Sequence, residues 1–299
     1  MKHQYIGVDI GGSHITAAVV NLVSGTINEA SLRRVPVDSH ASADEILTKW
    51  ATTIRQAVNS DLLSECQIGI AIPGPFDYKN GICRMQNVNK YEQLYGLNIK
   101  QELAHRLGVL PNQIHFRNDA EAFLAGEMLF GAGRGFKKGL GITLGTGLGT
   151  SIFENGQVRD LALGINHPLH DGVAEDFIST RWFIKRYAEL TQTPIKGVKE
   201  IADTYKTNPI ARQTFDEFAQ NIALVMTDFV AHYQPKVIIF GGNIAHASML
   251  FLDVVEAHLT QQNVTVDLRQ SALNELASLM GAVGFGITPV VDFQNSSAE

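Results

Sequence analysis

One stretch decides the fold of this chain: Tyr5-Ile6-Gly7-Val8-Asp9-Ile10-Gly11-Gly12-Ser13, an apolar run that ends in an aspartate and two glycines. The run is typical of a buried strand, and glycine at a strand end lets the backbone bend and approach a ligand. Two further apolar runs, Leu140–Leu144 and Lys236–Phe240, also end in glycine-rich turns. One such turn is common in α/β proteins. Three turns, the first headed by Asp9, predict backbone surfaces that converge on one polyphosphate.

The composition narrows the function classes. The 299 residues carry a net charge of -6 and are 45% hydrophobic, as in ordinary globular proteins. The acidic balance argues against a nucleic-acid partner, because nucleic-acid-binding domains tend to be basic. No apolar stretch approaches a membrane span and no secretory leader is visible, so we expect a cytoplasmic protein with no membrane partner. Cys66 and Cys83 lack CxxC spacing and predict buried thiols.

Strands and helices alternate along the first half, which indicates an α/β protein. A capping-box spacing at Ser42 and Glu45 predicts a helix start, and Asn98 predicts another that ends at Gly108. A further helix is expected over Ala120–Phe130. The predicted strands of this half are Tyr5–Ile10, Ile15–Val20, Ile27–Val37, Gln67–Ile72 and Gln113–Phe116.

The second half begins with the same strand–turn–strand unit, which predicts a duplicated architecture. Asn155-Gly156 is typical of a hairpin turn. The predicted strands are Leu140–Leu144, Gly149–Phe153, Gln157–Leu163, Lys236–Phe240 and Val264–Leu268, and the predicted helices are Val173–Leu190, Pro209–Tyr233 and Asn274–Phe285.

Two familiar nucleotide folds are excluded by missing motifs. The chain has no G-x-x-x-x-G-K-[ST] sequence, which a P-loop requires. No G-x-G-x-x-G opens a helix after a strand with an acidic residue beyond it, so a dinucleotide fold is not expected. The H-R-D signature of protein kinases is also absent from the sequence.

Five motifs carry a family resemblance, and together they resemble the ROK family of bacterial sugar kinases and repressors, part of the actin-like ATPase superfamily. The resemblance runs from about residue 5 to about residue 286. The motifs are Asp9-Ile10-Gly11-Gly12-Ser13, Pro73-Gly74-Pro75, Asn118-Asp119-Ala120, Leu144-Gly145-Thr146-Gly147 and Phe240-Gly241-Gly242.

The resemblance implies a two-lobed, ribonuclease H-like α/β fold with ATP and sugar in a cleft between the lobes. The smaller lobe is expected over 1–117 and the larger over 118–286, with the last helix packing back onto the first lobe, and 287–299 forming a tail. The family also implies a homodimer. ROK repressors carry an additional N-terminal helix-turn-helix segment, whereas this sequence starts at the phosphate strand, so we expect a kinase member.

Two acidic residues are the expected centre of the chemistry. By the resemblance, Asp119 takes the proton from the attacking sugar hydroxyl, which requires an ionised carboxylate within hydrogen-bond reach. The rival interpretation is helix capping, which Asn-Asp before a helix often provides, and the two roles are compatible. Asp9 is expected to orient Mg²⁺, directly or through water. Its rival role is to accept hydrogen bonds from the turn amides.

The nucleotide is expected on the three glycine turns. Ser13, Thr146 and neighbouring backbone amides would bind phosphate oxygens, and the turn at 241–243 would border the adenosine at a helix start. The expected nucleotide-binding residues are Gly11, Gly12, Ser13, Gly145, Thr146, Gly147, Gly241, Gly242 and Asn243.

The sugar is expected to contact Gly74, Asn87, Asn118, Glu175 and His167, positions that match sugar-facing residues of the family. Glu175 has a rival role as the acidic residue of a first helical turn, and His167 as an ordinary hydrogen-bonded loop histidine.

Three departures from the family pattern bear on the sugar and the metal. The family reads G-E-x-G-H where this chain has Leu163-Gly164-Ile165-Asn166-His167, so Gly164 replaces a sugar-binding glutamate. His14 stands in place of a lysine, and the cysteines that bind structural zinc are missing, so no structural zinc is expected.

Three functions follow from this pattern. The leading hypothesis is an ATP-dependent kinase of a hexose or N-acetylhexosamine, similar to a glucokinase. The replaced glutamate motivates a second hypothesis, a non-catalytic sugar or nucleotide sensor on a kinase scaffold. A third is an ATPase of the actin or heat-shock kind, which the sugar-side motifs at 73–75 and 118–119 disfavour.

Overall fold

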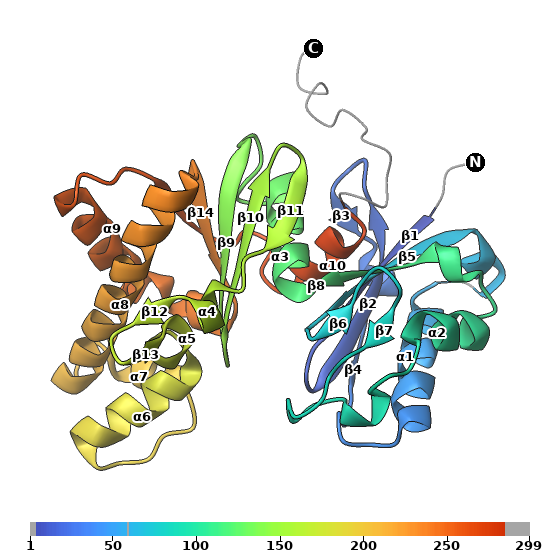
Figure 1. Ribbon diagram of the computed structural model, residues 1–299, viewed down its shortest axis with the longest axis horizontal. Helices are drawn as coiled ribbons and strands as arrows, with labels where there is room; N and C mark the ends of the chain where they lie inside the picture. The colour runs from blue at the N-terminus through green and yellow to red at the C-terminus, as the bar shows by residue number, and fades with distance from the viewer. Residues whose placement is uncertain (1–3, 59, 285–299) are drawn as a thin grey trace. The chain divides into compact units, whose positions relative to one another are not determined.

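The computed structural model describes residues 4–58 and 60–284, which divide into two compact units. Of the described residues, the first unit holds those up to Gly131 and those from Glu275 to Gly284, and the second is Ala132–Asn274 (Figure 1). The first unit thus extends beyond residue 117, because α3 (Asp119–Phe130) packs closely against α10 (Leu276–Ala282) and against its own sheet. The expected tail at 287–299 and the expected end of the last helix at Phe285 lie outside the described residues.

The first unit is built on a six-stranded sheet in the order β3-β2-β1-β5-β8, with β4 also pairing with β2. β1 runs antiparallel to β2 and parallel to β5, and β5 runs parallel to β8. A separate two-stranded hairpin, β6–β7, follows β5 in the chain. The strands are β1 (Gln4–Ile10), β2 (His14–Asn21), β3 (Thr26–Ile27), β4 (Arg33–Pro36), β5 (Cys66–Ile72), β6 (Phe76–Asp77), β7 (Ile82–Cys83) and β8 (Ile114–Asn118).

The two faces of this sheet are covered by different helices. Alternate residues of β1, such as Ile6 and Val8, point into a core shared with α1 (Ala43–Ala57) and α2 (Ile99–Leu107). The opposite face packs on α10, which contacts β1, β2, β5 and β8 (Figure 1). The predicted caps are confirmed, since α1 begins with a Ser42–Glu45 capping box. Asn98 caps α2, and Gly108 ends it in the left-handed conformation.

The second unit repeats the sheet order of the first, as β11-β10-β9-β14-β15. β9 runs antiparallel to β10 and parallel to β14, as β1 does to β2 and β5. The duplicated architecture predicted from the sequence is therefore confirmed. The strands are β9 (Lys138–Leu144), β10 (Leu148–Glu154), β11 (Gln157–Asp160), β14 (Val237–Gly241) and β15 (Asp267–Gln270), and a small hairpin is formed by β12 (Pro168–Leu169) and β13 (Gly172–Val173).

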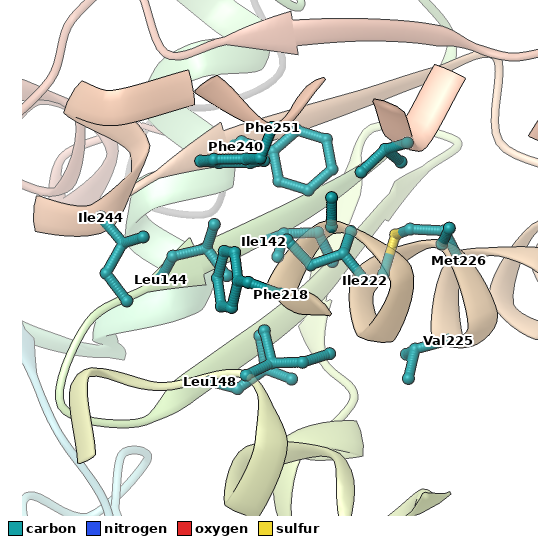
Figure 2. Close-up of a cluster of buried hydrophobic side chains, with 14 of the residues drawn as sticks. Ile142, Leu144, Leu148, Phe218, Ile222, Val225, Met226, Phe240, Ile244 and Phe251 are labelled. Atoms are coloured by element: carbon teal, nitrogen blue, oxygen red, sulfur yellow. The ribbon is translucent and has the colours of Figure 1, made fainter. Parts of the chain in front are cut away.

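A long helix, α8 (Pro209–Tyr233), supplies most of the helical side of the second core. Figure 2 shows its Phe218, Ile222 and Met226 facing side chains that come from the sheet, among them Leu144 and Phe240. The buried aromatic stripe of α8 is therefore core, as its spacing predicts. The other helices of this unit are α4 (Leu163–Asn166), α5 (Ala174–Phe177), α6 (Thr180–Thr191), α7 (Val198–Thr204) and α9 (Leu252–Gln261), with a 3₁₀ stretch at Asn243–Leu250.

Two predicted elements are interrupted in the structure. The strand expected at Ile27–Val37 breaks at Asn28, whose side chain accepts from the Ala30 amide and starts a 3₁₀ turn. The helix expected at Val173–Leu190 breaks at Ser179, a buried residue whose hydroxyl accepts from the Trp182 amide and begins a new helix. In both cases a short polar side chain bonds locally to the backbone and competes with the longer element.

Candidate functional site

The first glycine turn joins β1 to β2 in the first unit. The Gly11 amide donates to the His14 carbonyl at 3.0 Å, and the Tyr91 hydroxyl donates to the Gly11 carbonyl at 2.6 Å. Gly12 and Ser13 are exposed at the tip. Hydrogen bonds with His14 and Tyr91 thus fix the base of the turn, whereas its tip is exposed.

Asp9 lies at the end of β1, immediately before this turn, and is half-buried. The pKa of its carboxyl is raised to about 7, mainly by desolvation and next by the nearby Asp119 carboxylate. Arg34 opposes this rise, whereas Glu275 adds to it. A cation beside Asp9 would reverse the shift, because an opposite charge favours the ionised form. Asp9 is therefore a desolvated carboxyl with a second carboxylate, Asp119, near it.

Asn118 and Asp119 stand where β8 passes into α3, and the structure separates their roles. The Asn118 side-chain oxygen accepts from the amides of Ala120 and Glu121, at 2.8 and 3.2 Å, so Asn118 is the helix cap. Asp119 is the first helical residue, and its exposed carboxylate also accepts from the Ala120 amide at 2.9 Å. Because Asn118 supplies the cap, the start of α3 does not depend on Asp119 for capping.

Tyr78 connects this strand end to the Pro73-Gly74-Pro75 turn. Its hydroxyl accepts from the Asn118 side-chain amide at 3.2 Å and donates to the Ile72 carbonyl at 3.3 Å. A Cβ on Gly74 would lie 3.3 Å from the same hydroxyl. Gly74 and Asn118 are thus brought together around Tyr78. Asn87 lies apart from this network in an exposed turn after β7, with a left-handed φ of 58°.

The other two glycine turns meet each other in the second unit. Gly242 has a φ of 83°, and a Cβ there would lie 2.4 Å from the Leu144 carbonyl oxygen. Only glycine fits this conformation and approach without strain. The turn that starts at Leu144 is closed by a bond from the Gly145 amide to the Gly147 carbonyl at 3.0 Å, and the side chain of Thr146 is exposed. The turns at 144–147 and 241–243 therefore lie against each other.

A cavity of about 950 Å³ opens beside the turn at 241–243. Helix α7 and the 3₁₀ stretch after Gly242 form most of its wall. Its volume is within the range of small-molecule sites, and its lining is largely apolar with a few polar groups. The lining residues are Thr180, Gly197, Val198, Lys199, Ala202, Asp203, Tyr205, Lys206, Asn243, Ile244, His246, Ala247, Met249 and Leu250.

Glu175 lies against the turn at 144–149. Its carboxylate accepts from the Leu148 amide at 3.0 Å and from the Arg181 guanidinium at 2.6 Å. The Gly145 carbonyl in turn accepts from the Thr180 amide at 2.8 Å. The turn is therefore bonded to α5 through Glu175 and to the start of α6 through Thr180. Glu175 lies in the first turn of α5, and its two hydrogen bonds fix its carboxylate.

His167 makes the contacts of a hydrogen-bonded side chain. Its Nε2 lies 3.3 Å from the Asp228 carboxylate, and its ring packs edge-on against Phe229. His170 bonds Asn221 at 2.8 Å. Across residues 4–58 and 60–284, no group of three or more His, Cys, Asp or Glu side chains is arranged to hold a metal ion. Cys66 and Cys83 are both buried thiols, as predicted.

The sequence interpretation missed four residues around these turns: Tyr78, Arg181, Arg34 and Glu275. Tyr78 lies three residues after Pro75, outside the Pro73-Gly74-Pro75 motif. Arg181 lies at the start of α6, inside the longer helix that the sequence pattern predicted over Val173–Leu190. Arg34 and Glu275 are 241 positions apart and pair across the first unit. No short-range pattern in the sequence signals that pairing.

The duplicated sheet order, with glycine turns at the strand ends, defines the actin-like class of two-lobed α/β proteins. Within that class, a sequence profile of the ROK family matches residues 5–166 and 170–286, and the chain belongs to the ROK family. No helix in the described part of the chain has the length and apolar character that a membrane span needs.

Three relatives illustrate what the chain is similar to. It is 28% identical to a glucokinase of Thermotoga maritima, over 94% of this chain and 96% of that protein. It is 25% identical to an N-acetyl-D-glucosamine kinase of Photobacterium profundum, over 84% and 87% of the two chains. The crystal structure of a ROK family glucokinase from Streptomyces griseus, in complex with glucose and AMPPNP, matches with a TM-score of 0.74 and 25% identity, over 93% and 97% of the two chains.

Proposed function

We propose that this protein is an ATP-dependent sugar kinase that transfers the γ-phosphoryl group to a hydroxyl of a hexose or an N-acetylhexosamine. The names of its relatives support the substrate class, since they include a glucokinase and an N-acetylglucosamine kinase. The observation that carries the proposal is the state of Asp119. It is an exposed carboxylate near Asp9, at a helix start that Asn118 already caps.

Asp119 is the proposed catalytic base. A carboxylate that is ionised at neutral pH accepts the proton of the sugar hydroxyl as that hydroxyl attacks the γ-phosphorus. Its position at the first residue of α3 fixes the backbone, so the side chain needs to adopt only one reactive rotamer. Phosphoryl transfer depends mainly on positioning and on charge stabilisation, so one base of this kind is sufficient.

Asp9 is the proposed contact to Mg²⁺. Magnesium in phosphotransferases is bound through one or two carboxylates, with water and phosphate oxygens completing its shell. The neighbouring carboxyl groups of Asp9 and Asp119 fit that requirement, because they offer two acidic side chains in one place. When bound, the ion would neutralise charge on the phosphate oxygens.

The second unit supplies the proposed adenosine site. The cavity beside Asn243 has the volume and the largely apolar lining that an adenine ring needs. The turns at 145–147 and 241–243 lie against one another, and backbone amides of both are proposed to bind phosphate oxygens. In the first unit, Gly11, Gly12 and Ser13 are proposed to contact phosphate as well.

The proposed sugar contacts are Gly74, Asn87, Asn118, Glu175 and His167. Asn118 retains one amide hydrogen for a sugar hydroxyl, because its side-chain oxygen caps α3 and Tyr78 takes only one hydrogen. Glu175 keeps acceptor capacity on both oxygens beyond its bonds to Leu148 and Arg181.

One observation keeps the sensor as a second candidate. Gly164 replaces the glutamate of the family pattern, and it lies against the Leu148 carbonyl, where a side chain has no room. A coupled assay of ADP release across a panel of free sugars separates the functions. Sugar-stimulated release supports the kinase, and binding of ATP or sugar without turnover supports the sensor. Release that is independent of sugar supports a plain ATPase.

We also propose a homodimer that acts in the cytoplasm, on the strength of family membership alone. Sedimentation equilibrium tests the assembly, because a monomer at micromolar concentration would contradict it.

A further inference from the structure

A row of three side chains crosses the first sheet at the level of Asp9. Asp9 on β1 lies opposite Thr16 on β2, and Thr16 lies opposite Arg34 on β4. Residues that lie opposite one another on neighbouring strands point to the same face, at about 5 Å per step. Arg34 is therefore about two steps from Asp9 on one face of the sheet.

That face is the one covered by α10. The next residues along the strands, Ile10, Ile15 and Val35, belong to the core on the α1 side. Asp9, Thr16 and Arg34 alternate with them and point the other way. Ala71 on β5, opposite Asp9, confirms the direction, because it packs against Ala282 of α10.

Arg34 is paired with Glu275, at the start of α10, through its Nη1 and a carboxylate oxygen. Both side chains are substantially exposed, at 45% and 61%. An exposed ion pair of this kind contributes little to stability. The location of the pair is more informative than its stability, because the charges of Arg34 and Glu275 both shift the pKa values of Asp9 and His14.

Among the described residues, the carboxyl groups of Asp9, Asp119 and Glu275 therefore lie near the guanidinium of Arg34. Burial and the Arg34 charge both lower the pKa of His14, so its imidazole is neutral at pH 7 and adds no positive charge. Arg117 is in the same row, opposite Ala71, but its guanidinium donates to the Gly281 carbonyl at 3.2 Å. Arg34, by contrast, pairs with the exposed side chain of Glu275, which another anion can replace.

We propose that Arg34 binds the terminal phosphates of the nucleotide, and that Glu275 is its resting partner, displaced when the nucleotide binds. The inference rests on the proposed kinase function and adds a nucleotide-binding residue to it. Arginine suits this task because its planar guanidinium bonds phosphate oxygens in pairs and is always charged. Removing Glu275 should therefore favour the nucleotide, whereas removing Arg34 should disfavour it.

The test compares three variants by calorimetric titration with AMP, ADP and AMPPNP in the presence of magnesium. Arg34→Ala should weaken AMPPNP binding about 10- to 100-fold, ADP binding less, and AMP binding hardly at all. Glu275→Gln should tighten AMPPNP binding about two- to fivefold. Arg33→Ala is the matched control, because Arg33 is on the same strand, faces the other way and donates to the Ala30 and Leu32 carbonyls.

The two substitutions should change AMPPNP affinity in opposite directions if Arg34 binds the nucleotide. A purely structural ion pair would not give that difference. The proposal is overturned if Arg34→Ala binds AMPPNP as tightly as Arg33→Ala does, or if Arg34→Ala and Glu275→Gln weaken it equally. Should Arg34→Ala fail to fold, Arg34→Gln and Glu275→Gln still give the comparison of signs. If the unmodified protein binds no adenine nucleotide, the proposed function itself fails. If it phosphorylates sugar while Arg34→Ala behaves like Arg33→Ala, only this inference fails.

Discussion

A Cβ added to Gly164 would lie 2.2 Å from the carbonyl oxygen of Leu148. This contact arises because the chain before α4 is bonded to β10, with the Leu161 and Leu163 amides donating to the backbone and side-chain oxygens of Thr150. The segment therefore runs too close to β10 for any side chain at position 164. Gly164, which replaces the family glutamate, is therefore required by this packing. The replacement changes the local backbone as well as removing a carboxylate.

Gly164→Glu should destabilise the protein by about 1–3 kcal/mol or more, and Gly164→Ala by a similar amount, because each forces the backbone away from Leu148. Ile165→Glu is the control, since it places the same carboxylate one residue away on a side chain that is 62% exposed. Urea denaturation measures the difference. Equal urea midpoints for Gly164→Glu and Ile165→Glu would show that the backbone at position 164 moves away from Leu148 at little cost in free energy.

Asp119→Asn should lower kcat by about 10²–10⁴ and leave the free energy of unfolding almost unchanged. The base is lost, whereas an asparagine retains the oxygen that accepts from Ala120, and the helix cap remains on Asn118. Asn118→Ala should show the complementary stability effect, a loss of about 1 kcal/mol with the cap. Steady-state assay and urea denaturation of both variants provide the check. An unaltered kcat in Asp119→Asn would remove Asp119 from the mechanism.

Sequence patterns predicted most of the helices and strands, because these elements form through interactions between residues that are close in the sequence. Caps at Ser42 and Asn98 and the apolar periodicity of 209–233 depend only on neighbours within a few residues, and the structure has each of them. The repeated strand–turn–strand unit also predicted the duplicated sheets. Local side-chain bonds at Asn28 and Ser179 then divided two elements that apolar pattern alone made continuous.

Site residues that belong to a single sequence motif could be predicted. Contacts between segments that are distant in the sequence could not. Asp119 and the glycine turns stand in recognisable motifs. By contrast, the Arg34–Glu275 pair and the contact of Gly164 with Leu148 depend on tertiary packing. The unit boundary has the same origin, since α3 stays with the first sheet through its close packing on α10.

Ala202→Phe should weaken binding of adenine nucleotides by about tenfold or more, because Ala202 lines the cavity beside Asn243 and a phenyl ring would occupy it. Glu200→Phe is the control, since Glu200 is exposed on the same helix and is not in the cavity lining. Calorimetric titration with ADP gives both affinities. Equal affinities would move the adenosine away from this cavity.

Glu217→Gln should lower stability at pH 7 by about 1 kcal/mol, because the Glu217 carboxylate bonds Arg186 through both oxygens, at 2.6 and 3.0 Å. The bond to the Arg186 guanidinium holds the pKa of Glu217 below its ordinary 4.5. The pair therefore stabilises the fold above that value and is lost as pH falls through the lower folded pKa. Urea denaturation at pH 7 and at steps below pH 4.5 should show the gap between Glu217→Gln and the unmodified protein closing with acid. Glu189→Gln, which removes the weaker 3.2 Å partner of Arg186, should show a smaller gap at pH 7. A gap in Glu217→Gln that persists in acid would mean that the side chain contributes through packing and not through its charge.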